Sequence, residues 1–126
     1  MAHTREKIER DRCANESEKR VFDRLKRLER QGAITSFRHA HDTPQKGESV
    51  SEEARKIDFV ITLWKETIYL QVKESDERAA NHATEHPNIP CVIVRPDPAE
   101  MTDGEIDRKI LTALKRTFEG QKGICL

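Results

Sequence analysis

The chain has 126 residues, of which 35% are hydrophobic and 37% charged, and its 23 basic and 23 acidic side chains give a formal net charge of zero. This length predicts one domain over residues 1–126, with a small core under a heavily charged surface. No apolar run approaches the ~20 residues of a membrane span, and the first residues do not form a secretory signal. Three cysteines without metal-like spacing favour reduced thiols in a cytoplasmic protein.

The first predicted element is a long helix over residues 4–31, a segment without Pro or Gly. Apolar residues such as Val21 and Leu25 recur at spacings of three and four and mark one face of this helix. The same stripe passes through Glu18, whose carboxylate either points toward the core side or lies on the margin and reaches water. The stretch Lys19–Arg30 holds six basic and two acidic residues, which fits either a solvated helix face or a surface that faces phosphates.

A short strand is predicted over residues 34–39, followed by a long loop over residues 40–56 that is rich in Pro, Gly, Ser and charge. Apolar and polar side chains then alternate in two runs within residues 57–73, which is the pattern of a β-hairpin. One face of this hairpin is aliphatic apart from Phe59, so we expect that face to be core.

The hairpin also predicts a polar cluster. A turn centred between Lys65 and Glu66 would place Asp58 opposite Lys73, on the face that also carries Gln71. One interpretation is an ordinary cross-strand ion pair between Asp58 and Lys73, which would contribute little to stability. The other is a site for a hard divalent cation, which takes oxygen ligands and assists phosphodiester hydrolysis.

The remaining segments predict a helix over residues 76–84 and a buried, parallel strand over residues 91–94. A capping box, Thr102–Glu105, begins a last helix that ends near Gly120. The element order is therefore α-β-β-β-α-β-α, which indicates an α/β fold with a mixed central sheet.

A second motif is formed by His82 and His86, which match an inverted zinc-protease pattern. Two histidines four residues apart can share a helical face and bind zinc. Pro87 ends the helix directly afterwards, and the sequence favours an ordinary polar helix end on the surface.

A helix that carries Glu18, followed by a hairpin with Ile57-Asp58 on one strand and Gln71-Val72-Lys73 on the next, resembles the PD-(D/E)XK nuclease superfamily. The resemblance covers about residues 14–95. It extends to archaeal Holliday-junction resolvases and to the end-cleaving nuclease subunit of heteromeric transposases, in which a Gln-x-Lys variant also occurs. Ile57 stands where the family has Pro, and Gln71 stands where it usually has Glu.

This resemblance implies a restriction-endonuclease-like core, αβββαβ with a mixed central sheet, plus a C-terminal helix. It also implies an endodeoxyribonuclease that depends on Mg²⁺ or Mn²⁺ and hydrolyses phosphodiester bonds in DNA. The catalytic residues would be Glu18, Asp58, Gln71 and Lys73, with Asp58, Gln71 and Glu18 as metal ligands.

We expect DNA to contact the basic helix and the loop 40–56, through Lys19, Arg20, Arg24, Arg27, Arg30 and Lys46. Cleavage of both strands or of a junction would need a homodimer, because one domain this small covers one strand break. No Gly-rich phosphate loop is present, so no nucleotide cofactor is expected. The alternative is a non-catalytic module of the same fold that binds DNA or a protein partner.

Overall fold

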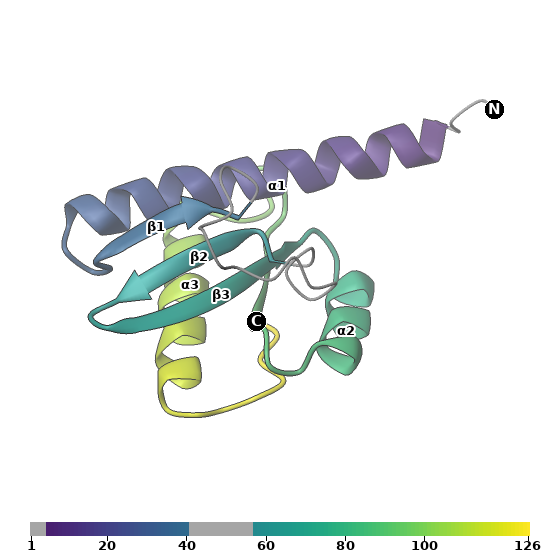
Figure 1. The fold of residues 1–126 in the computed structure, drawn as a ribbon. Helices are drawn as coiled ribbons and strands as arrows, with labels where there is room; N and C mark the ends of the chain where they lie inside the picture. Colours follow the sequence, from purple (N-terminus) through teal and green to yellow (C-terminus); the bar gives the residue numbers. More distant parts are fainter. Residues whose placement is uncertain (1–4, 41–56) are drawn as a thin grey trace.

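The computed structural model describes residues 5–40 and 57–126, with side chains from residue 15 onward. Its elements follow the predicted order (Figure 1). They are α1 (Arg5–Arg30), β1 (Ser36–His39), β2 (Phe59–Leu63), β3 (Glu66–Lys73), α2 (Asp76–Glu85), β4 (Cys91–Ile93) and α3 (Asp103–Phe118).

The four strands form one sheet in the order β1-β2-β3-β4. The first three strands are antiparallel neighbours, and β4 runs parallel to β3 after the crossover through α2. The predicted α/β class, the mixed sheet and the parallel final strand are thus confirmed. The predicted capping box is also present, since Thr102 Oγ1 accepts a hydrogen bond from the Glu105 backbone and the Glu105 side chain accepts one from Thr102.

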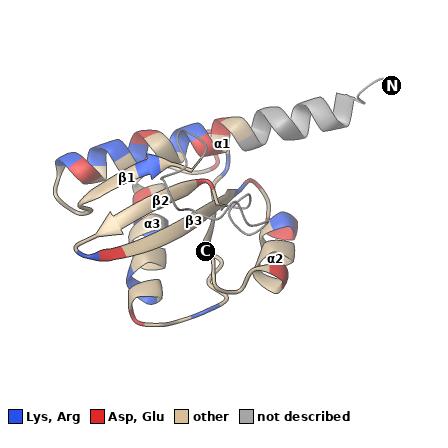
Figure 2. Cartoon of the chain, viewed as in Figure 1, with Lys and Arg blue, Asp and Glu red and all other residues tan. Residues whose placement is uncertain are grey.

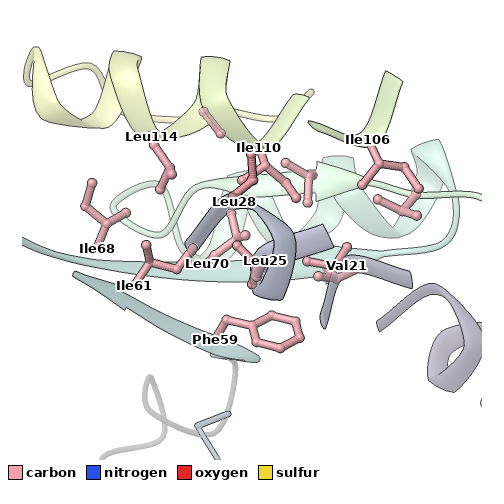
Figure 3. Packing of buried hydrophobic residues seen from close by; sticks show 14 of the residues in the cluster. Val21, Leu25, Leu28, Phe59, Ile61, Ile68, Leu70, Ile106, Ile110 and Leu114 are labelled. Atoms are coloured by element: carbon pink, nitrogen blue, oxygen red, sulfur yellow. The ribbon is translucent and has the colours of Figure 1, made fainter. Parts of the chain in front are cut away.

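The core lies between one face of the sheet and the helices α1 and α3. Figure 3 shows side chains of the two helices and of β2 and β3 packed into one cluster. The helical stripe of α1 is buried as predicted, and so is the apolar face of the hairpin. The cluster includes Val21, Leu25, Leu28, Phe59, Ile61, Ile68, Leu70, Val72, Ile106, Ile110 and Leu114.

The predicted register of the hairpin is wrong by two residues. Its turn consists of Trp64 and Lys65, so Leu63 pairs with Glu66 and Val60 pairs with Tyr69. Asp58 is therefore not opposite Lys73. A slip of two residues preserves which side chains share a face, because side chains alternate with a period of two along a strand. The predicted core face survives the error for this reason.

Within residues 5–40 and 57–126, no helix combines the length and the apolar character that a bilayer crossing requires. Cys91 and Cys125 are both free thiols, as the sequence predicts for them.

Candidate active site

Three strand ends meet at one end of the sheet and gather the predicted polar residues. His39 ends β1, Asp58 directly precedes β2, and Lys73 ends β3. The backbone N–H of Ala40 donates to the Asp58 carbonyl at 2.9 Å, which joins the first two of these ends. The hairpin turn lies at the opposite end of the same strands, so this polar end is the open end of the hairpin (Figure 1).

The Asp58 carboxylate is held against the backbone of β3. Its Oδ2 atom accepts a hydrogen bond from the Val72 N–H at 2.8 Å. The pKa of this carboxyl is raised to about 7, chiefly by burial and then by the negative charge of Glu18, while the Val72 hydrogen bond and the charge of Lys73 oppose the shift. Asp58 therefore holds an ionised carboxylate at neutral pH only at a cost, which a nearby cation would remove.

Gln71 is the neighbour of Val72 on β3 and is only 7% exposed. Its Oε1 atom is buried, and no hydrogen-bond partner for it exists among the described residues. A buried amide oxygen without a partner costs free energy, so native structures rarely leave one unused. Gln71 thus presents a buried oxygen atom that could act as a metal ligand, beside the backbone that holds Asp58.

Glu18 reaches this end of the sheet from α1. Its Oε1 atom lies 3.2 Å from Nε2 of His39, and its charge acts on Asp58. The Glu18 side chain is 22% exposed and contacts His39, so of the two positions open from the sequence it lies nearer the inward one. The His39 ring lies against Phe59, with a centroid distance of 4.7 Å, which fixes the ring beside Glu18.

His39 is not part of the motif formed by Glu18, Asp58, Gln71 and Lys73. A histidine at the end of a short strand shows no periodicity that would pair it with a glutamate 21 positions earlier. The antiparallel pairing of His39 with Phe59 is what brings it to the site. Glu74 is a second residue near the site that the motif omits. It acts on Asp58 and forms an ion pair with Arg78 at 3.0 Å.

The residues present fit a hard divalent cation such as Mg²⁺. Two carboxylates, Glu18 and Asp58, and the amide oxygen of Gln71 are the oxygen ligands that such ions prefer. The unpartnered Oε1 atom is the observation that supports this fit. No group of three or more His, Cys, Asp or Glu side chains that could hold a metal exists in the described part of the chain, so a site here would depend on the amide oxygen.

Two of the basic residues predicted to contact DNA are engaged within the protein. The Arg20 guanidinium donates to the carbonyls of Arg95 and Met101 at 2.8 and 2.7 Å, and it pairs with Asp103 at 3.1 Å. These bonds attach the segment that links β4 to α3 onto helix α1. Arg20 is therefore a structural residue, and we remove it from the DNA-contacting set.

Arg24 is engaged in the same way. Its Nε and Nη2 atoms donate to the two carboxylate oxygens of Asp107, both at 2.7 Å. The hydrogen bond to Asp107 raises the pKa of the Arg24 guanidinium, although burial opposes the shift. This bidentate interaction joins α1 to α3. We therefore no longer expect Arg24 to contact DNA.

The other three predicted DNA contacts on α1 face outward. Lys19, Arg27 and Arg30 are exposed, and Figure 2 shows Lys and Arg positions along the second half of the helix, interspersed with Asp and Glu positions. Arg27 and Arg30 line a polar hollow of about 520 Å³ at the end of α1. Lys46, like the rest of the predicted loop after Ala40, lies outside the described residues.

The expectation for the His82–His86 motif is wrong in one respect. His82 is buried rather than on the surface, and its Nε2 atom lies 2.9 Å from the Ile89 carbonyl. Burial lowers the pKa of its imidazole. The ring thus connects the end of α2 to the segment before β4, and its Nε2 atom is already engaged there.

Comparison of the chain with models of known protein families, with curated proteins and with solved structures finds no match in any of the three.

Proposed function

We propose that this protein is an endodeoxyribonuclease that depends on Mg²⁺ or Mn²⁺ and has a restriction-endonuclease-like core. The observation that carries the proposal is the buried, unpartnered Oε1 atom of Gln71, beside a carboxyl whose pKa burial raises to about 7. Both features cost stability in the free protein, and a bound divalent cation would relieve both. The resemblance of Glu18, Asp58 and Gln71-Val72-Lys73 to the PD-(D/E)XK pattern supports the same conclusion.

In this proposal Asp58, Gln71 and Glu18 hold the cation. When bound, such an ion would supply Lewis-acid chemistry, polarising the scissile phosphate and lowering the pKa of an attacking water. The Lys73 ammonium lies near enough to Asp58 to affect its pKa, and it offsets the charge that develops on the phosphoryl oxygens. His39 holds the Glu18 carboxylate toward Asp58 by its contact at 3.2 Å.

DNA would approach this end of the sheet from the outer side of α1. Lys19, the residue after Glu18, is exposed beside the site, and Arg27 and Arg30 are exposed farther along the helix, toward its C-terminal end. All three supply positive charge for the phosphate backbone. Cleavage of both strands, or of a junction, would require two copies of the chain, since one domain presents one such site.

The test is a cleavage assay of the purified chain on duplex, flap, junction and single-stranded DNA, with Mg²⁺ or Mn²⁺. We expect cleavage with either metal and none in EDTA. Asp58→Asn should abolish cleavage by weakening the metal site, and Lys73→Met should abolish it while metal still binds. If neither metal binds the wild-type protein, even with DNA present, the enzyme proposal fails and the non-catalytic module is the better account.

A further inference from the structure

An apolar groove lies at the end of the sheet opposite the candidate active site. Its walls are the hairpin tip, with Leu63 and Trp64, and the last turns of α3, with Leu111, Leu114 and Phe118. The groove has a volume of about 330 Å³. We refer to it as the Trp64 groove.

Trp64 does little for the fold of the single chain. Its side chain is 81% exposed, and its backbone has a φ of 60°, in the left-handed region that a bulky residue adopts only at a cost. Phe118 is 56% exposed and Leu111 is 40% exposed on the facing helix. Large apolar side chains gathered around one hollow mark a surface that another molecule covers.

The charges at the rim indicate which molecule this is. Lys65 and Glu66 follow Trp64 at the hairpin tip, and Lys115 and Glu119 border the groove on α3. None of these four side chains forms an ion pair with another residue that the structure describes. Each side of the groove thus carries one positive and one negative charge, so the rim as a whole is neutral.

We propose that the Trp64 groove is the interface of a two-fold symmetric homodimer. In such an interface the same surface meets itself, so the hairpin tip of one copy faces the α3 end of the other. Trp64 then enters the groove of the second copy, and Lys65 of one copy meets Glu119 of the other. A neutral rim suits this arrangement and does not suit DNA, whose phosphates would select a basic rim.

Two further properties agree with self-association. The net charge of the chain is zero, so two copies do not repel each other over long range. The five residues of β2 separate Asp58 from Trp64, which at ~3.3 Å per strand residue puts the groove roughly 20 Å from the candidate active site. A dimer formed here leaves that site open. The inference stands whether or not the protein is a nuclease.

The single tryptophan of the chain makes the test direct. Dilution series of the 126-residue chain are followed by analytical ultracentrifugation and by Trp64 fluorescence. We expect the mass to rise from monomer to dimer with concentration, and the emission of Trp64 to shift to the blue over the same range. A monomer at every concentration, with the emission of an exposed indole throughout, would overturn the proposal.

Variants locate the interface. Trp64→Gly should remain monomeric without losing thermal stability, because glycine adopts a φ of 60° without cost. Leu111→Lys, on the exposed part of α3, should also stay monomeric. Tyr69→Ser removes an aromatic side chain that is 42% exposed but away from the groove, and this control should dimerise like the wild type. Dimers of Trp64→Gly as stable as those of the wild type would exclude the groove.

A charge exchange tests the identity of the partner. Glu119→Lys should weaken dimerisation at least tenfold, and adding Lys65→Glu in the same chain should restore it, because the exchanged charges again meet across the two-fold axis. Equal association of the wild type and Glu119→Lys would overturn the pairing on which the choice of a second copy rests. An emission shift that requires duplex DNA, with no change of mass on protein concentration, would assign the groove to nucleic acid instead.

Discussion

The carboxylate of Asp58 accepts a hydrogen bond from the backbone N–H of Val72, at 2.8 Å, just beyond the last paired residues of β2 and β3. A carboxyl side chain thus serves as the partner of a backbone N–H at the end of the β2–β3 pairing. Because this position is largely buried, the geometry that aims the carboxylate also makes its ionisation costly. This conflict leads to the first prediction.

Stability without metal should fall as the pH rises from about 4 to about 7. The pKa of Asp58 is raised from 3.8 to about 7 in the folded protein, so in this range the folded state keeps a proton that the unfolded state has lost. The contribution is fully present below the unfolded pKa and is lost as the pH passes the folded pKa, on the order of a few kcal/mol. Asp58→Asn should remove this pH dependence while keeping an acceptor for Val72.

Urea unfolding of both proteins across this pH range in EDTA measures the effect. The difference in unfolding free energy should grow with pH in favour of Asp58→Asn and level off above about pH 7. Saturating Mg²⁺ should flatten the wild-type profile, since a cation favours the ionised carboxylate. Parallel profiles of the two proteins would show that Asp58 is not the group responsible.

Substitutions at Gln71 should change the metal affinity and the stability of the metal-free protein. Gln71→Glu places a full negative charge among the oxygen ligands, so we expect tighter Mg²⁺ binding and cleavage at lower metal concentration. Gln71→Met removes the buried oxygen that lacks a partner, so the metal-free protein should gain about 1 kcal/mol of stability, whereas metal binding should be lost. Calorimetric titration with Mg²⁺ and urea unfolding supply the two readouts. Unchanged affinity in both variants would show that Gln71 is not a ligand.

His39 should act as a positioning residue for Glu18. His39→Phe keeps a ring against Phe59 but loses the contact with Glu18, so the Mg²⁺ concentration for half-maximal cleavage should rise about tenfold, the lower end of the range for partners of metal ligands. His39→Gln keeps a donor near the position of Nε2 and should recover most of the affinity. The comparison depends on equal melting temperatures. If the two variants lose affinity equally, packing rather than the contact with Glu18 is what matters.

The arginines of α1 should separate into two functional groups. Arg27→Gln and Arg30→Gln should each reduce the salt dependence of DNA binding by about one counterion, because both side chains are exposed. Arg24→Gln should leave the salt slope unchanged but cost about 1–3 kcal/mol of stability, since it breaks the paired hydrogen bonds to Asp107. Filter binding over a salt series, with urea unfolding of each variant, distinguishes them. A reduced slope for Arg24→Gln alone would reverse the assignment.

The sequence predicts the elements of this fold well because their signals are local. The stripe through Val21 and Leu25, the alternation around Phe59 and the capping box at Thr102 each depend on residues within a few positions of one another. The register of the hairpin is less local. The backbone N–H of Trp64 donates to Thr35 Oγ1 at 2.9 Å, and this contact, 29 positions away in sequence, supports a turn that nothing in the residues themselves favours.

The candidate site divides in the same way. The alternation of side chains places Asp58, Gln71 and Lys73 on one face of the hairpin. This shared face is kept despite the register error, because the error is an even number of residues. The basic character of the helix also predicted that Arg20 contacts DNA. The sequence of a basic helix is the same whether its side chains bind phosphates or the carbonyls of another segment. The acceptors of Arg20 lie 75 or more positions away, a pairing that only tertiary structure reveals.

The last three residues give β4 a second neighbour. The backbone N–H of Cys91 donates to the Ile124 carbonyl at 2.9 Å. The Leu126 N–H donates to the Cys91 carbonyl at 3.0 Å, and the Leu126 carbonyl accepts from the Ile93 N–H at 2.6 Å. The outer hydrogen-bonding groups of β4 are thus occupied by the chain's own end. A chain cut after Gly123 would expose them as a template for intermolecular β-pairing, and such bare edges lead to aggregation.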